Sequence, residues 1–162
     1  MGIPMYGQNK DGDRLNQYAD GLAKVKVVTK SEVLTAADSG SYIVFDMAAA
    51  NVTVDLPSPV AGMWFEFSFA GTAAEAQDYI IDTKSDTNYF RGGLSILDTD
   101  ATADGAEALV AILPDGNSNS TMTLKTIDNG TNFRLVSDGT LWYTSGQICS
   151  ATATAVVYGD QP

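Results

Sequence analysis

The residues best suited to bind a cation lie in two acid-rich segments. In the first, "NKDGDRLNQYAD", Asn9, Asp11 and Asp13 stand at alternate positions and Asp20 stands at the twelfth. A calcium loop of the EF-hand type uses ligands at such positions, but it also requires glycine at its sixth position and a bidentate glutamate at its twelfth. This chain has Arg14 at the sixth position. The segment therefore lacks both the glycine turn and the bidentate glutamate that this kind of calcium loop needs.

The second segment, "DTDATADGAE", contains Asp98, Asp100, Asp104 and Glu107. Carboxylates are the hard oxygen ligands that calcium prefers, so a weak calcium site is one interpretation of this loop. The alternative is that these acids are simply hydrated, as loop acids on a protein surface usually are. We favour the second interpretation and expect the chain to use no metal and no other cofactor.

Carboxylates alone can also catalyse hydrolysis, as a pair of acids placed across a cleft. The candidates are Asp82, Asp86, Asp98 and Asp100, and all of them fall at predicted strand ends or turns, where aspartate is common for turn reasons. The chain has no histidine, which removes the usual general base and the commonest metal ligand. The single cysteine, Cys149, lies in an apolar stretch and is expected to be a small buried residue. We expect no enzymatic activity.

The charge of the chain argues against nucleic acid as a partner. Nine Lys+Arg residues against 20 Asp+Glu residues give a net charge of −11, and such a chain repels a phosphate backbone. The apolar run "LVAIL" is far shorter than the ~20 residues that a membrane-spanning helix requires. The N-terminus has no basic region followed by an apolar one, so it does not have the pattern of a secretory signal. We expect a soluble protein without membrane contact.

Alternation of apolar and polar residues with a period of two recurs along the chain and predicts β-strands. Between the alternating stretches lie "ADSGS", "PSPVAG", "DGNSNS", "DNGT" and "SDGT", which hold the Gly, Asn, Asp and Pro that turns require. Many short strands predict an all-β fold, an antiparallel sandwich or barrel-like module over 25–162 behind a short extended N-terminal arm over 1–24. The predicted strands are 25–29, 42–47, 52–56, 63–69, 79–82, 94–97, 108–113, 122–127, 132–136, 141–144 and 148–158.

The stretch "NVTVDLPSPVAGMWFEFSFAG" holds two such strands and a stiff corner. In the second strand, alternation places Phe65 and Phe67 on one face and Trp64 on the opposite face. Pro57 and Pro59 donate no backbone hydrogen bond, so they end the first strand and hold the corner extended. We expect the corner to be part of the scaffold and to carry no chemistry.

Two stretches carry a resemblance to a known family. "LTAADSGSYIVFDMAAANVTVDLPSPVAGMWFEFSF", followed later by "LVSDGTLWYTSG", resembles a β-module that recurs in virion proteins of tailed phages. The similarity spans roughly residues 33 to 146 and rests on short, turn-rich motifs. Asp55 interrupts the "V-T-L-P" of the family, and Leu141 occupies a position that is often Asn; both leave the turn chemistry intact. The resemblance implies a structural virion subunit, usually a homotrimer, either a head decoration protein or a part of a tail fibre.

Two further features bear on how such a subunit would bind. The segment "MGIPMYGQNKDGDRLNQYADG" is polar except for a small apolar cluster of Ile3, Pro4, Met5 and Tyr6. It is either a frayed terminus or an arm that orders on a partner, and we favour an arm whose apolar cluster contacts the capsid. Trp64 would be exposed on a one-sided sheet, so we assign it to the interface between subunits.

Together these observations favour a capsid decoration protein, also called a cement protein. A chain of 162 residues without a repeat is short for a complete fibre and a natural size for a decoration subunit. We expect it to bind the outside of the head as a homotrimer, with the major capsid protein as its partner, on virions assembled in the host cytoplasm. A tail-fibre or receptor-binding module is the main alternative, and a carboxylate hydrolase is the third.

Overall fold

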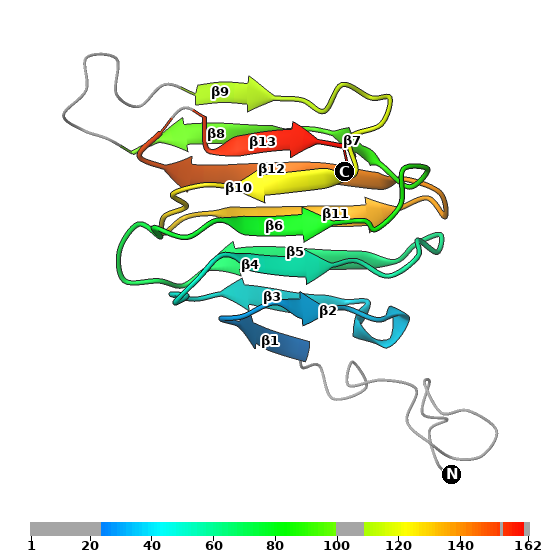
Figure 1. The fold of residues 1–162 in the computed structure, drawn as a ribbon, viewed down its shortest axis with the longest axis horizontal. Helices are drawn as coiled ribbons and strands as arrows, with labels where there is room; N and C mark the ends of the chain where they lie inside the picture. The colour runs from blue at the N-terminus through cyan, green and yellow to red at the C-terminus, as the bar shows by residue number, and fades with distance from the viewer. Residues whose placement is uncertain (1–23, 100–108, 153, 161–162) are drawn as a thin grey trace, which may run out of the picture.

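The computed structural model describes residues 24–99, 109–152 and 154–160, and these residues form two facing β-sheets (Figure 1). One sheet has eight strands and the other five. The only helical element in the described residues is a short 3-10 turn at Ala36–Asp38. The predicted all-β, sandwich-like fold is confirmed. No helix among the described residues is long and apolar enough to cross a membrane.

The eight-stranded sheet has the strand order β1-β3-β5-β11-β12-β8-β9, and β7 pairs with β12 beside this path. Its strands are β1 (Lys24–Val28), β3 (Ser41–Phe45), β5 (Trp64–Phe69), β7 (Phe90–Gly92), β8 (Leu94–Asp98), β9 (Leu109–Ile112), β11 (Asn132–Ser137) and β12 (Trp142–Ser150). The five-stranded sheet has the order β13-β10-β6-β4-β2. Its strands are β2 (Glu32–Val33), β4 (Val52–Asp55), β6 (Tyr79–Asp82), β10 (Thr121–Leu124) and β13 (Val156–Gly159).

The first half of the chain winds between the two sheets. From β1 to β6 each strand lies in the sheet opposite to the one before it, so strands two apart in the sequence become neighbours and run parallel. The predicted antiparallel pairing is therefore wrong for much of the molecule, since six of the eleven strand pairings are parallel. The reason is that the turns lead across to the other sheet and do not fold back along the same one.

The corner between β4 and β5 is one of these crossings. It carries the chain from the five-stranded sheet to the eight-stranded sheet, and Gly62 turns it with a φ of 83°, a conformation that glycine adopts without strain. The Gly62 N–H donates a hydrogen bond of 2.8 Å to the carbonyl oxygen of Ser137, at the end of β11. The corner thus joins both sheets and fixes the entry into β5.

The core fills the space between the sheets with aromatic and branched side chains. Phe67 stacks on Phe133 of the neighbouring β11, with ring centroids 4.8 Å apart, and Phe45 stacks on Tyr79 of the opposite sheet at 4.3 Å. All four side chains are fully buried. Cys149 is buried too, as its apolar setting in the sequence predicted.

Candidate interaction surfaces

One of the candidate carboxylates for catalysis, Asp82, is held by a lysine together with Asp55. Asp55 and Asp82 end the neighbouring strands β4 and β6 and face each other in register. The ammonium group of Lys84 lies 3.2 Å from an Asp55 carboxylate oxygen and 3.0 Å from one of Asp82. The Lys84 backbone N–H also donates a hydrogen bond of 2.7 Å to Asp82. These acids are charge-paired within the scaffold, while Asp86 lies exposed in the following turn.

The predicted cation ligands lie largely outside the described residues. Asp100, Asp104 and Glu107 belong to the stretch 100–108, and the earlier acid-rich segment and the arm cluster of Ile3, Pro4, Met5 and Tyr6 belong to 1–23. Within 24–99, 109–152 and 154–160, no three His, Cys, Asp or Glu residues are grouped so that they could hold a metal ion.

The three turns that carry the family resemblance meet at one end of the sandwich. In the turn before β3, the Gly40 N–H donates to the Trp64 carbonyl oxygen at 2.8 Å, and the Ser39 hydroxyl accepts from the Trp64 N–H at 3.2 Å. In the turn after β11, Gly139 lies so close to Ala61 of the corner that a Cβ on Gly139 would be 3.3 Å from the Ala61 nitrogen. Residues of the resemblance motifs thus hold three segments together: the turn before β3, the corner that leads into β5 and the turn after β11.

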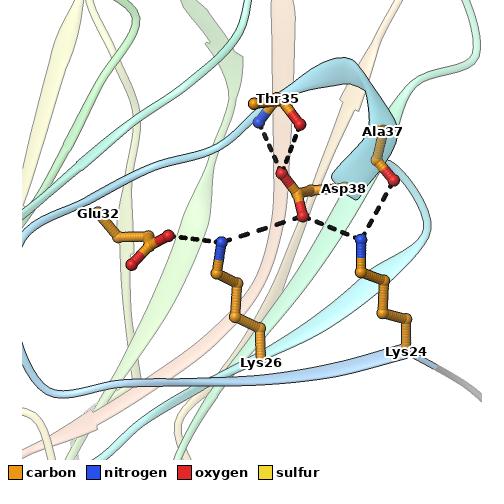
Figure 2. A network of polar contacts seen from close by, with 6 residues as sticks. All are labelled: Lys24, Lys26, Glu32, Thr35, Ala37 and Asp38. Carbon is orange, nitrogen blue, oxygen red and sulfur yellow. Dashed lines mark hydrogen bonds and ion pairs between the residues drawn. The ribbon is translucent and has the colours of Figure 1, made fainter.

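The first turn of the winding holds a network of charged side chains at one end of the core (Figure 2). The Lys24 ammonium lies 3.0 Å from an Asp38 carboxylate oxygen and donates to the Ala37 carbonyl oxygen at 3.2 Å. The Lys26 ammonium lies 2.6 Å from the Glu32 carboxylate and 3.9 Å from Asp38. Charges from both sheets and from the 3-10 turn therefore close the core at this end.

Asp38 is the centre of this network. Its second carboxylate oxygen accepts hydrogen bonds from the Thr35 N–H at 2.8 Å and from the Thr35 hydroxyl at 2.7 Å. Burial by itself would raise the pKa of Asp38, but the hydrogen bonds from Thr35 and Lys24 outweigh it and hold that pKa well below its usual range. The carboxylate therefore stays charged wherever the protein is folded at ordinary pH.

With Lys24 and Lys26 pointing inward, β1 turns Val25 and Val27 outward, while Val28 is buried in the core. Val25 is 60% exposed and Val27 is 61% exposed, on the outer face of the eight-stranded sheet. Their register partners on β3 are Tyr42 and Val44, both half-buried on the same face. The four side chains form an apolar strip at the edge of the sheet. The short β2 repeats this reversal in the other sheet, because Val33 is 64% exposed while Glu32 joins the charged network.

The opposite edge of the sandwich also exposes apolar side chains. Leu109 on β9 is 68% exposed and Leu113, just after β9, is 69% exposed; on β13, Val157 is 43% exposed. The alternation of β9 places Val110 and Ile112 against the core, so Leu109 lies on the outer face. Figure 1 shows β1 and β2 at one end of the stack of strands, with β9 and β13 toward the other. We call these ends the β1/β2 edge and the β9/β13 edge.

The exposed apolar residues are concentrated at these two edges. Nine large apolar residues are exposed in the described part of the chain, and six of them belong to the β1/β2 or the β9/β13 edge. Between the edges, the outer face of the eight-stranded sheet is polar at the register-matched positions Glu66, Arg134 and Ser145. An edge strand has backbone N–H and C=O groups ready to pair with another chain. Apolar side chains beside such groups are typical of a protein-binding surface.

Trp64 lies where the alternation predicted, on the face of β5 opposite the buried phenylalanines. The Arg134 guanidinium lies over its ring, 4.4 Å from the ring centroid, and the side chain is half-buried. Its assignment to a subunit interface stays a prediction. Because the arginine already contacts one side of the ring, Trp64 has less to gain from a partner than the edge valines have.

A second cluster, the Tyr143 cluster, consists of Tyr89, Arg91, Asp138 and Tyr143. The Tyr143 hydroxyl donates to an Asp138 carboxylate oxygen at 3.1 Å, and the Arg91 guanidinium lies 5.4 Å from the Tyr89 ring centroid. Backbone N–H groups of the following turn hold the pKa of Asp138 below its ordinary value, and the bond to Asp138 raises the pKa of Tyr143. Arg91 and Tyr143 are register partners on β7 and β12, and Tyr143 is 43% exposed.

Comparison of the chain with protein-family models, with curated proteins and with solved structures finds no match. The conclusions about function therefore rest on the surfaces described above and on the motif resemblance.

Proposed function

We propose that this chain is a structural subunit of a tailed-phage virion, a decoration protein that binds the outside of the head as a homotrimer. The observation that carries the proposal is the exposure of apolar side chains on edge strands at both ends of the sandwich. Such edges are suited to bind other protein chains. The three turns resemble those of a virion β-module, and this resemblance favours other virion proteins as the partners.

The subunit would act by mass action and without a reaction. A protein that binds the assembled shell but not its separated parts shifts the equilibrium toward assembly. In this proposal the major capsid protein is the partner, and the cluster of Ile3, Pro4, Met5 and Tyr6 in the arm makes the capsid contact. A trimer would present three such clusters, and avidity would strengthen the binding of each.

The proposal is tested by decorating heads that lack this protein. Purified chain is added to the heads, free chain is removed by sedimentation, and the particles are imaged by electron microscopy with and without the chain. We expect added density on the head and a higher temperature of shell disruption. A variant that lacks the first dozen residues should fold and form trimers but bind the heads more weakly. Binding to tails alone would contradict the proposal.

The Tyr143 cluster favours the second candidate function, a receptor-binding module. An exposed aromatic ring beside a carboxylate and a guanidinium is the combination with which proteins hold small polar ligands, since the ring packs and the charged groups orient. The test is binding to host-surface glycans, compared between the wild type and the Tyr143→Ala variant. Binding that the substitution abolishes would establish this function, and the absence of any binding would remove it.

A further inference from the structure

We propose that copies of this chain join head to tail, with the β1/β2 edge of one copy docking on the β9/β13 edge of the next. This inference rests on the homotrimer of the proposed function and names the surface that forms it. It starts from the two edges, since β1 pairs only with β3 and β9 only with β8 among the described strands. Each therefore has one side on which another strand can add.

The two edges match in the placement of their apolar side chains. In the eight-stranded sheet, Val25 and Val27 of β1 and Leu109 of β9 all lie on the outer face. If β1 of one copy pairs with β9 of the next, these side chains become cross-strand neighbours, about 4.5–5.5 Å apart at Cβ. The five-stranded sheet offers the same match, because Val33 of β2 and Val157 of β13 are both exposed. The two edges thus place exposed apolar side chains beside one another in both sheets.

Charge complementarity selects this pairing over a symmetric one. Residues 24–40 carry Lys24, Lys26 and Lys30 against Glu32 and Asp38, which is 3 − 2 = +1 in a chain of net charge −11. Lys24 and Lys26 are paired within each copy to Asp38 and Glu32, so the exposed Lys30 carries the excess positive charge of this edge. Pairing two β1/β2 edges would bring two segments of net positive charge together, and like charges placed opposite each other destabilise a strand pair. This excess charge instead favours an acidic partner.

The β9/β13 edge is that acidic partner. The described residues of this edge and its flanks, 94–99, 109–120 and 156–160, contain Asp98, Asp115 and Asp160 and no Lys or Arg. The Arg91 guanidinium of β7 lies beside Gly116 in this flank, so the acids exceed the bases by three to one. The Asp115 carboxylate accepts the Asn117 and Ser118 N–H groups, and these bonds hold its pKa below its ordinary value, so the charge persists. A basic edge therefore meets an acidic one, and each covers the exposed apolar residues of the other.

A head-to-tail contact uses two different surfaces on every copy. Such contacts build a ring when the rotation between copies closes and an open filament when it does not. A homotrimer is the ring that closes after three copies. This geometry also leaves both faces of the sandwich and the end with the three fastened turns available for other partners.

The test uses two variants, each of which introduces charged side chains at one edge. Val25→Lys/Val27→Lys places charge on the β1/β2 edge, and Leu109→Lys/Leu113→Lys places it on the β9/β13 edge. Val60→Lys is the matched control, because Val60 is 56% exposed on the corner, away from both edges. Mass is measured by sedimentation velocity and light scattering at micromolar concentration, and folding by circular dichroism.

We expect the wild type and the control to be trimers and each edge variant alone to be a monomer. Mixing the two edge variants should give a heterodimer and nothing larger, because one unspoiled edge of each kind remains in the mixture. If the lysine variants do not fold, threonine replaces them at the same positions, and the dissociation constant of the trimer should then rise about tenfold or more, because apolar burial is lost.

Other outcomes overturn the inference in ways that can be told apart. Edge variants that both stay trimeric would refute the edge contact and leave the trimer of the proposed function standing, with dissociation by Trp64→Ala then locating the interface on that face. A dimeric wild type that only one of the edge variants dissociates would show a symmetric contact and refute the head-to-tail one. A monomeric wild type would refute the trimer itself, and the head-to-tail contact with it.

Discussion

Replacing Asp38 by asparagine tests whether the charged network stabilises the open end of the core. The amide of Asp38→Asn keeps one oxygen for Thr35 but turns an NH2 group toward the Lys24 ammonium, which now loses its acceptor at 3.0 Å. Hydrogen bonds that involve a charged group contribute about 1.5–3 kcal/mol each. Lys24 is 34% exposed on its side chain and can turn to water, so we expect a loss near the lower end, about 1.5 kcal/mol.

The pH dependence of this loss follows from the lowered pKa of Asp38. A carboxylate whose pKa is lower in the folded state stabilises the fold fully above its unfolded pKa, near 3.9, and this stabilisation disappears as the pH falls through the folded pKa. The difference between wild type and variant should therefore be constant above about pH 5 and shrink by roughly 1.4 kcal/mol per pH unit below about pH 4.

The assay is urea unfolding of both proteins at pH 7, 5 and 3, followed by circular dichroism. Asp128→Asn is the control, because that carboxylate accepts the neighbouring Asn129 N–H at 2.7 Å and lies away from the network. Equal stability of wild type and Asp38→Asn at pH 7 would refute the role of the network. A difference that stays the same from pH 7 to pH 3 would refute the electrostatic explanation and indicate a packing effect.

Four further outcomes are expected. Phe67→Ala removes a fully buried ring stacked on Phe133 and should cost about 3–5 kcal/mol in the free energy of unfolding by urea. Gly146→Ala would place a Cβ 2.5 Å from the Asn132 carbonyl oxygen, so its melting temperature should fall by several degrees, whereas an unchanged value would show that β11 and β12 can separate there. Glu75→Gln weakens a buried acceptor of two backbone N–H groups and should speed hydrogen exchange in the loop that carries it, with global stability less affected. EDTA should leave head binding unchanged, and a loss that calcium restores would establish a metal site.

The strands could largely be predicted from the sequence, because alternation reports which side chains share a face. The predicted strands 52–56, 63–69 and 79–82 correspond to β4, β5 and β6. Alternation does not report which sheet a strand joins or in which direction its neighbour runs, so the winding between sheets was missed. The prediction of one strand over 148–158 was wrong, since the chain leaves β12 after Ser150 and enters the other sheet at Val156.

The orientation of β1, which decides the β1/β2 edge, also could not be predicted from the sequence. "KVKVV" alternates equally well with lysines or with valines toward the core, and burial of valine is the usual outcome. In this chain the lysines point inward because β1 ends its sheet and the acids Glu32 and Asp38 lie opposite. Those acids come from β2 and from the 3-10 turn, and only the fold brings them together. The sequence did predict the face of β5 on which Trp64 lies, because that strand has the usual orientation.

The winding of β1 to β6 has a consequence for folding during synthesis. Strand neighbours in this half are close in the sequence, so they can form in order as the chain leaves the ribosome. The strands β5 and β6 are different, because their second neighbours, β11 and β10, begin only at Asn132 and Thr121; of the two, β5 is the phenylalanine-rich one. At ordinary rates of translation one side of β5 waits unpaired for on the order of seconds. Aggregation of truncated or slowly translated chains should therefore begin at β5, and slower translation over 70–131 should lower the yield of soluble protein.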